Sequence, residues 1–467
     1  MRRAIICLAM VLAAMATPVA AWDTSRSIVR IKSGLVGRTV IQSICSQLNC
    51  QVVRTLDGLP GGTEPSSLFL VRNLPLPSPF VNYDLLGIEA VEPDLPAALT
   101  SEDDGFWNSS QATAAVLDQL WDRTPVGYFG ATAWQSYLTQ PAAAIVRVTE
   151  AHCSLRATGG GTVAVIDTGV DPSHPTLAPV LTVGYDFTRD VEGGNERADV
   201  DQATSAVLDR VFGVNQATAA VLDQATAAVL DDGAHAYFGH GTMVAGIVHL
   251  AAPTASIMPL KAFTARGEGY TSDIIRAINY ATRQGAKVLN MSFSRPTPSR
   301  EIERALAHAT EAGLIAVASA GNDGQSTRMY PAAYDGVMGV ASTSNEDDRS
   351  SFSNYGADFV WVAAPGEGII TTYPWGSFAA VWGTSFSAPL VAGGAALLAG
   401  LEGSATHSQA AAAIAQAQAL TAELGHGRLD LVQAVTAGRD LWPNAPESAV
   451  PDTCAAAGVD WSQEETP

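Results

Sequence analysis

Positive charge is scarce in this chain of 467 residues. Lys and Arg together number 26 against 46 Asp and Glu, which gives a formal net charge of −20 at pH 7. Nucleic acids and anionic membranes attract proteins through clustered positive charge, so we expect neither as a partner. Charged residues make up only 15% of the chain and hydrophobic residues 47%, a composition typical of folded proteins. The length leaves room for two or three domains.

Long apolar runs are also scarce, and the clearest one opens the chain. Residues 1–22 (MRRAIICLAMVLAAMATPVAAW) combine a basic start, an apolar stretch and small residues near Ala21. This pattern predicts a signal peptide at 1–21, cleaved before Trp22. A membrane anchor is the alternative, but the run is short for a span. We expect no later membrane-spanning stretch, and therefore a secreted protein, either extracellular or periplasmic.

Cysteine is the third scarcity, with five in the whole chain. Signal removal leaves Cys45, Cys50, Cys153 and Cys454. An oxidising compartment favours disulfides, and four cysteines allow three pairings. We favour Cys45–Cys50 with Cys153–Cys454, because the first pair would then lie within one small domain. Four free, buried thiols are the alternative.

The first part of the mature chain predicts a small α+β domain at 22–99. Its apolar patterns indicate four strands and two helices, separated by turns rich in Gly and Pro. An extended tail, PDLPAAL (93–99), ends the domain, and a polar linker follows at 100–124. The predicted strands are 27–32, 50–55, 68–72 and 88–92, and the predicted helices are 36–48 and 79–86.

The larger domain is predicted at 125–442, with a tail at 443–467. Buried apolar strands alternate with amphipathic helices, which indicates an α/β fold with a doubly wound, mostly parallel sheet and helices on both faces. TVAVID (162–167) is typical of a strand buried on both sides. For the helix near Asp273, we expect Thr271 or Ser272 as the N-cap and Gly285 at the end.

Three polar residues in separate segments of this domain occur in the order Asp, His, Ser. Asp167 ends the strand TVAVID, His240 lies in GHGTMVAG, and Ser385 lies in GTSFSAP at the start of an Ala- and Leu-rich helix. Alone, each fits an ordinary role as a helix cap or a packed side chain. Together they supply a nucleophile, a base that activates it, and a carboxylate that orients the base. Pro389 indicates an early turn of the helix after Ser385.

These segments resemble the catalytic signatures of the subtilisin-like serine proteases, or subtilases. AVIDTGVD, GHGTMVAG and GTSFSAP occur in that family's order, and the resemblance extends over about 130–440. It implies that Asp167 orients His240, that His240 acts as base and then as acid, and that Ser385 attacks the peptide carbonyl. It further implies that Asn322, in ASAGNDG, helps to bind the oxyanion.

The resemblance also implies a substrate cleft, in which the peptide lies between two exposed edges. The family commonly has glycine where Ser294 stands, and many relatives have a smaller residue in place of Met329. Ser294 would change the geometry of the pocket wall, and Met329, near the base of the pocket, favours medium-sized apolar side chains over charged ones. The implied edge residues are Gly267, Gly269, Ser292, Phe293 and Ser294, and the implied pocket residues are Ser319, Ala320, Gly321 and Met329.

Residues 22–99 resemble subtilase propeptides, which form a ferredoxin-like domain. The resemblance implies an intramolecular inhibitor that helps folding and then blocks the cleft with its tail. We therefore expect self-cleavage within about 97–125, polypeptide substrates and a monomeric enzyme that requires no cofactor. Structural calcium is compatible with the resemblance, although the sequence names no ligand loop and we assign no metal ligands.

The phrase QATAAVLD occurs at 111–118, 216–223 and 224–231, and QATSAVLD occurs at 202–209. An eight-residue period turns about 80° per copy on an α-helix, so tandem copies share no apolar stripe. We expect a low-complexity insertion at about 200–232 on the domain's rim, with a flap over the cleft as the alternative.

Two other functions are alternatives to a protease. A subtilase scaffold without activity would act as a binding or structural module. Such scaffolds usually lose one member of the triad, whereas this chain keeps all three. An esterase or lipase is disfavoured because the chain lacks a Gly-x-Ser-x-Gly elbow around Ser385.

Overall fold

The computed structural model describes residues 23, 25–33, 37–62, 65–75, 82–99, 122–200, 237–449 and 454. The predicted signal peptide, most of the linker and all four copies of the repeat lie outside the described residues. The described chain forms two compact units. One is built from the described parts of 1–55 and 65–96, and the other from 56–64 and 97–467.

The smaller unit is a four-stranded antiparallel sheet in the order β2-β3-β1-β4 with one described helix. Ile41 and Ile44 of the helix pack in a common core with Val29, Phe69 and Val71 of the strands. The four predicted strands and the first predicted helix are confirmed. The elements are β1 (Arg26–Ile31), α2 (Arg38–Leu48), β2 (Gln51–Thr55), β3 (Leu68–Arg72) and β4 (Ile88–Pro93).

The second helix predicted for this unit, near 79–86, is not formed by the described residues of that stretch. Residues 83–87 make turns instead. The Asn82 side chain accepts a hydrogen bond from Leu85 N, which offers the backbone a local alternative to helix. The predicted helix at this position is therefore wrong over 82–86, and 79–81 lie outside the described residues.

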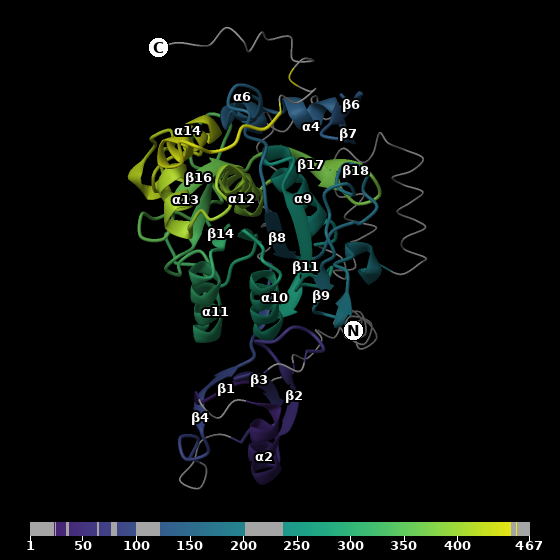
Figure 1. The fold of residues 1–467 in the computed structure, drawn as a ribbon, viewed down its shortest axis with the longest axis vertical. Helices are drawn as coiled ribbons and strands as arrows, with labels where there is room; N and C mark the ends of the chain where they lie inside the picture. The colour runs from purple at the N-terminus through teal and green to yellow at the C-terminus, as the bar shows by residue number, and fades with distance from the viewer. Residues whose placement is uncertain are drawn as a thin grey trace, which may run out of the picture. The chain divides into compact units, whose positions relative to one another are not determined.

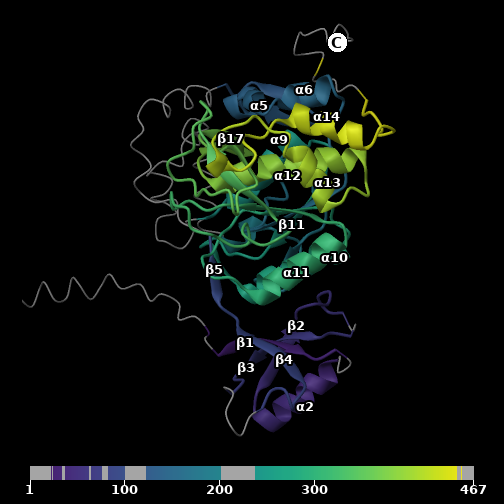
Figure 2. The ribbon, with the colours of Figure 1, turned by 90° about the vertical axis from the view of Figure 1, so that its left-hand side faces the viewer.

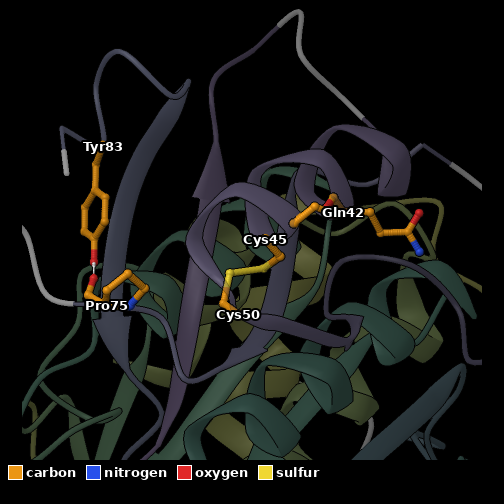
Figure 3. Close-up of a disulfide and its surroundings, with 6 residues drawn as sticks. Gln42, Cys45, Cys50, Pro75 and Tyr83 are labelled. Atoms are coloured by element: carbon orange, nitrogen blue, oxygen red, sulfur yellow. Dashed lines mark hydrogen bonds between the residues drawn. A yellow bond between two sulfur atoms is a disulfide. The ribbon is translucent and has the colours of Figure 1, made fainter. Parts of the chain in front are cut away.

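A disulfide between Cys45 and Cys50 joins α2 to the start of β2 (Figure 3). Between the two cysteines, Asn49 adopts the left-handed conformation at the helix end, and Cys50 N donates to Cys45 O at 3.0 Å. Figure 3 also shows Tyr83 with its hydroxyl directed at the Pro75 carbonyl oxygen, to which it donates. The predicted pairing of these two cysteines is confirmed.

The larger unit is built around an eight-stranded sheet in the order β10-β9-β11-β8-β13-β14-β15-β16. All neighbours are parallel except β9 and β10, which are antiparallel and two residues long. In this sheet β8 pairs with β11 on one side and with β13 on the other. The strands that precede β13 along the chain, β9 to β11, all lie on the β11 side, so the strand order reverses at β8. The strands are β8 (Thr162–Asp167), β9 (Tyr185–Asp186), β10 (Val191–Glu192), β11 (Ser256–Lys261), β13 (Val288–Met291), β14 (Ile315–Ser319), β15 (Met338–Thr343) and β16 (Val362–Pro365).

This strand order makes the carboxyl end of β8 a topological switch point. In open α/β sheets, the crevice that binds ligands forms where the strand order reverses in this way. Asp167 is the last residue of β8 and therefore lies at this position.

Helices cover both faces of the sheet, as predicted. Figures 1 and 2 show α9 (His240–Ala251) and α12 (Thr384–Leu401) on one face and α10 (Thr271–Arg283) and α11 (Arg300–Glu311) on the other. The α12 helix is long and apolar enough to cross a membrane, contrary to the expectation from sequence, but 94% of it is buried inside the protein. It is therefore the central core helix, with α9 packed against it.

The start of α10 differs from the prediction. The helix begins at Thr271 and is preceded by Tyr270, and no side chain caps it. The Thr271 hydroxyl accepts a hydrogen bond from Arg295 instead, at 2.8 Å. Neither Thr271 nor Ser272 is thus the N-cap, although the helix does end just before Gly285.

Smaller elements complete the larger unit. The hairpin β17–β18 packs against α9. These elements are β6 (Pro125–Tyr128), β7 (Ala131–Trp134), α4 (Gln135–Thr139), α5 (Pro141–Ile145), α6 (Val148–Cys153), η2 (Glu196–Asp199), β17 (Ile369–Tyr373), β18 (Ser377–Val381), α13 (His407–Ile414), η3 (Ala422–Leu424) and α14 (Leu431–Leu441).

The described part of the C-terminal tail packs on the larger unit. Ser448 N donates to the Arg156 carbonyl oxygen at 3.0 Å, and Arg156 forms an ion pair with Glu447 at 2.9 Å. Cys454 is bonded to Cys153 at the end of α6 and is 2% exposed. The second predicted disulfide is confirmed, and it fixes the tail to the domain.

Candidate active site

Asp167 and His240 are joined by a hydrogen bond of 2.7 Å between Oδ1 and Nδ1. Asp167 is completely buried at the end of β8, and His240 is the first residue of α9. Because the carboxylate accepts, Nδ1 carries the proton and Nε2 is left as the basic nitrogen. A side chain at Gly239 would place its Cβ 2.3 Å from the Tyr373 ring, so only glycine lets the chain enter α9 here.

Ser385 is the second residue of α12. The following residue, Phe386, packs its ring 5.4 Å from the His240 ring, measured between centroids. The Ser385 hydroxyl donates to the Ser292 carbonyl oxygen at 3.3 Å. The fold thus brings the Asp167–His240 pair and the start of α12 to one place.

Pro389 lies in the second turn of α12, one turn later than an N-terminal proline. Proline has no N–H for the carbonyl four residues earlier, which here belongs to Ser385. The Ser292 hydroxyl donates to that carbonyl oxygen instead, at 2.8 Å. Ser292 and Ser385 are therefore joined by two hydrogen bonds, one in each direction.

Asn322 follows β14 and is held against the start of α12. Its Oδ1 accepts hydrogen bonds from Thr384 N at 2.9 Å and from Thr384 Oγ1 at 2.8 Å. The Thr384 hydroxyl also accepts from Gly321 N at 3.2 Å. These contacts fix the Asn322 amide next to the backbone of Ser385.

The first predicted substrate edge, Gly267–Tyr270, is paired with another strand of the same chain. The edge strand β12 (Glu268–Tyr270) pairs with β5 (Pro96–Ala98). Leu99 N donates to the Gly267 carbonyl oxygen at 2.8 Å. Ala97 and Leu99 are each 4% exposed. The end of the predicted inhibitory tail therefore lies along Gly267–Tyr270 within the larger unit.

The predicted pocket residues Gly321 and Met329 lie close to the predicted edge residue Ser294. A Cβ added to Gly321 would lie 3.2 Å from Met329 Cγ and 3.3 Å from Ser294 Oγ. It would also lie 2.5 Å from Asn354 Nδ2, and the backbone of Gly321 has a φ of +104°, so glycine is required here. The other predicted pocket and edge residues, Phe293, Ser319 and Ala320, are buried beside them, each at most 2% exposed.

Asn354 is a pocket residue that the sequence did not reveal. Its Nδ2 donates to the Ala320 carbonyl oxygen at 3.2 Å, and its Oδ1 accepts from Asp323 N at 3.0 Å and from Gln325 N at 3.1 Å. The side chain thereby holds the 320–325 loop that carries Gly321 and Asn322. No local pattern marks an asparagine for such a role.

Comparison with known proteins identifies the family of the chain. The sequence model of the subtilase family matches residues 158–438, which is more than half of the chain. The chain belongs to the subtilase family. Its class of activity is accordingly that of a serine-type endopeptidase.

Several named proteases resemble this subtilase over part of their length. Thermitase of Thermoactinomyces vulgaris is 36% identical over 252 residues, which cover 54% of this chain and 79% of thermitase. The thermophilic serine proteinase of Bacillus sp. (strain AK1) is 35% identical, over 52% of this chain and 53% of its own. Subtilisin BL of Lederbergia lenta is 39% identical, over 34% of this chain and 62% of its own.

A solved structure supports the fold. The crystal structure of a lanthipeptide protease superposes with a TM-score of 0.51 at 22% identity, covering 64% of this chain and 94% of that chain. The likeness supports the α/β subtilisin-like architecture of the larger unit.

The subtilase family is generally calcium-binding, which is compatible with structural calcium in this chain. In the described part of the chain, no three His, Cys, Asp or Glu side chains come together to hold a metal ion. Near β9, Asp190 is paired with Arg276, and Asp199 is paired with Arg189 and, at 2.6 Å, with Lys261. These two carboxylates are therefore paired with protein cations, and we assign no metal ligands.

A second buried carboxylate, Glu196, lies beside the Asp167–His240 pair of this subtilase. It is completely buried in the turn η2 and accepts hydrogen bonds from both sides of the pair, from Thr168 and from the first residues of α9. Burial raises the pKa of Glu196 to about 7, against the opposing effect of the hydroxyl donors and Lys261. The segment GGNERAD, in which it lies, is typical of an ordinary loop and gave no signal of this role.

Proposed function

We propose that this subtilase is a secreted endopeptidase that uses Asp167, His240 and Ser385 as its triad and is made as a self-cleaving precursor. The observation that carries the proposal is the 2.7 Å hydrogen bond between Asp167 and His240 beside the start of α12. The signal peptide predicted at 1–21 and the two disulfides support export to an oxidising compartment.

In the proposed reaction, Ser385 Oγ attacks the carbonyl carbon of the scissile peptide bond while His240 Nε2 accepts its proton. Asp167 stabilises the resulting imidazolium and holds the ring in the productive tautomer. His240 then protonates the leaving amine, which departs and leaves an acyl-enzyme. Water, activated by His240, hydrolyses this ester and restores Ser385.

Asn322 and the backbone N–H of Ser385 are proposed to bind the oxyanion of each tetrahedral intermediate. The Asn322 carbonyl oxygen is occupied by Thr384, so its Nδ2 group is the end that donates. Fixed donors of this kind stabilise developing negative charge without reorganisation during the reaction.

The substrate is proposed to bind as an extended strand between Gly267–Tyr270 and Ser292–Ser294. The β5–β12 pairing supports this, because it is the kind of strand addition that a peptide would make. The closeness of Ser294 and Met329 to Gly321 narrows the first specificity pocket. We therefore expect medium-sized apolar side chains to be preferred at the cleaved position.

Residues 22–99 are proposed to act as a ferredoxin-like propeptide and intramolecular inhibitor. The position of Ala97–Leu99 along β12 supports this role. A second segment of the propeptide, 56–64, also belongs to the larger unit, where Asn279 donates to Leu56 O at 3.0 Å. We expect cleavage within 97–125, on the C-terminal side of Leu99, and a monomeric product.

The proposal is tested by comparing wild type with Ser385→Ala in an exporting host. Wild type should lose its N-terminal domain, react with a serine-directed fluorophosphonate and digest casein. Ser385→Ala should accumulate with residue 22 at its N-terminus and show neither labelling nor digestion. The cleavage sites in casein report the side chains that the pocket prefers.

A matched control is Ser387→Ala, since Ser387 is also buried in α12 but donates to the Pro365 carbonyl oxygen. It should be processed and labelled like wild type. Equal full-length accumulation of wild type and Ser385→Ala, without labelling, would contradict the proposal. That result would favour the inactive binding scaffold, which the similarity to named proteinases does not otherwise support.

A further inference from the structure

Four hydrogen-bond donors converge on the buried carboxylate of Glu196. Its Oε1 accepts from Gly239 N at 2.8 Å and from the Thr168 hydroxyl. Its Oε2 accepts from Thr242 N at 3.2 Å and from Thr242 Oγ1 at 2.6 Å. Two donors on each oxygen satisfy an ionised carboxylate, which can only accept.

The directions of these hydrogen bonds follow from the backbone groups behind them. Gly241 N–H donates to Thr168 Oγ1 at 2.9 Å, and Asp171 N–H donates to Thr242 Oγ1 at 2.9 Å. Each hydroxyl therefore accepts one bond and has a single proton to give. Both protons go to Glu196, so the carboxylate is the acceptor on which the two threonines depend.

Thr168 connects this arrangement to the Asp167–His240 pair. Its hydroxyl is close to Glu196 Oε1 but 3.3 Å from Asp167 Oδ1. Since its proton is given to Glu196, Asp167 Oδ1 keeps its lone pairs for His240 Nδ1 and for Thr168 N, both at 2.7 Å. Without an acceptor at Glu196, the hydroxyl would turn to Asp167 and compete with His240.

Charged groups on the neighbouring elements also act on the pKa of Glu196 and of the residues around it. Lys261 on β11 is completely buried and donates to the Thr168 carbonyl oxygen at 2.7 Å and to Asp199 at 2.6 Å. Asp186 and Arg189 also act on Lys261. On the side of β17, Tyr373 presents a buried hydroxyl, and Glu196 raises its pKa further above the ordinary value.

We propose that Glu196 is a positioning residue for the triad. It holds the start of α9 and the Thr168 hydroxyl, so that the Thr168 hydroxyl does not compete with His240 for a hydrogen bond to Asp167. Its negative charge favours the protonated form of His240. The inference rests on the proposed triad. The hydrogen bonds that the described residues make to Glu196 come from Thr168, Gly239 and Thr242, none of which is a predicted substrate-binding residue. Its replacement should therefore change kcat and not KM.

The pH dependence of activity follows from the same contacts. Burial raises the pKa of Glu196 to about 7, so its charge is present above neutral pH and is lost below it. A neutral side chain at this position lacks the charge at every pH and places Thr168 against Asp167. Both changes make His240 easier to deprotonate and a weaker base.

The test compares wild type, Glu196→Gln and Glu196→Asp in hydrolysis of a peptide substrate from pH 5 to 9. Glu196→Gln should lower kcat about 10- to 100-fold, the loss expected for hydrogen bonds to a charged group, with KM nearly unchanged. The acidic limb of its kcat profile should move to lower pH by at most about half a unit, because wild-type Glu196 loses its charge in the same pH range. Glu196→Asp keeps the charge but cannot reach all four donors, so kcat should fall several-fold with the acidic limb in place.

Glu301→Gln is the matched control, because Glu301 is a buried glutamate of α11 paired with Arg304. A Glu196→Gln enzyme that matches this control in kcat and pH profile would overturn the inference. If Glu196→Gln does not fold, full kcat in Glu196→Asp would overturn it, since the exact reach of the carboxylate would then not matter. Failure of wild type to hydrolyse peptides would instead reject the proposed function.

Discussion

Helix α9 carries two buried histidines with opposite surroundings. His240, its first residue, has Asp167 on Nδ1 at 2.7 Å and Glu196 close behind. His249, near the end of the helix, has no hydrogen-bond partner on either ring nitrogen among the described residues, and its ring meets Tyr128 edge-on at 5.3 Å. Burial lowers the pKa of His249 to about 3. The carboxylates that surround a histidine, and not its helix, decide whether it can take up a proton.

Two further histidines are buried like His249, but each of them has a hydrogen-bond partner. His152 hydrogen-bonds the Ala251 carbonyl oxygen and His174 the Ser377 carbonyl oxygen, each at 2.9 Å. Burial lowers the pKa of both to about 4. These three side chains are held in the neutral form by burial, whereas His240 is kept in contact with negative charge.

The largest effect is expected from removing the carboxylate that distinguishes His240. Asp167→Asn keeps the shape of the side chain but can present an N–H₂ group to Nδ1, which favours the wrong tautomer of the imidazole. We expect kcat to fall about 10⁴-fold, measured with a peptide substrate and by the rate of fluorophosphonate labelling. A loss of less than tenfold in correctly folded protein would mean that His240 does not depend on Asp167.

The next effect concerns the stability of the fold in acid. Burial lowers the pKa from the ordinary 6.5 to about 4 for His152, to about 4 for His174 and to about 3 for His249. Between these values and pH 6.5, the unfolded chain therefore binds three protons that the folded protein does not bind. Glu196 acts in the opposite sense, because its pKa of about 7 exceeds its ordinary value and the folded protein binds that proton first. The net difference for these four groups is two protons.

Stability should therefore be lost as the pH falls from 6.5 towards 4. Each proton contributes up to about 1.4 kcal/mol per pH unit to the free energy of unfolding. Denaturant unfolding of Ser385→Ala, which avoids self-digestion, at pH 7, 6, 5 and 4.5 measures the slope. A free energy that stays level or rises over this range would show that these histidines are not held neutral.

The smallest effect is expected from replacing the unpartnered histidine. His249→Leu removes two buried ring nitrogens without hydrogen bonds and should raise the free energy of unfolding by about 1 kcal/mol, with less loss in acid. Activity at pH 8 should not change. Calorimetry at pH 8 and 5.5 tests the prediction.

His152→Leu serves as the comparison, because His152 does have a hydrogen bond to lose. It should gain less stability than His249→Leu or be destabilised. Equal gains from the two substitutions would show that the hydrogen-bond partner makes no difference at these sites.

The parts of the molecule that the sequence predicted well are those marked by local patterns. The strand at 162–167 was predicted at its observed bounds, because five apolar or β-forming residues are followed by Asp167. Asp167, His240 and Ser385 each lie in a short segment of characteristic sequence. The disulfides followed from counting cysteines and from domain boundaries.

The features that the sequence did not reveal depend on contacts between distant segments. Glu196 meets Thr168 28 positions earlier and Thr242 46 positions later, and nothing in its own segment indicates either contact. The sequence around Thr271 predicts a helix cap, but Arg295, 24 positions away, donates a hydrogen bond to the Thr271 hydroxyl. Asn354 holds the carbonyl of Ala320 from 34 positions away. Such roles are created by the packing of the sheet.

The disulfide between Cys153 and Cys454, which lie 301 positions apart, has a consequence for any peptide-bond cleavage between them. It closes a covalent ring that contains His240, Ser385 and three of the four repeat copies. One peptide-bond cleavage anywhere inside this ring opens the chain without releasing a fragment. The halves stay one molecule, heavier by a single water, until a reductant separates them.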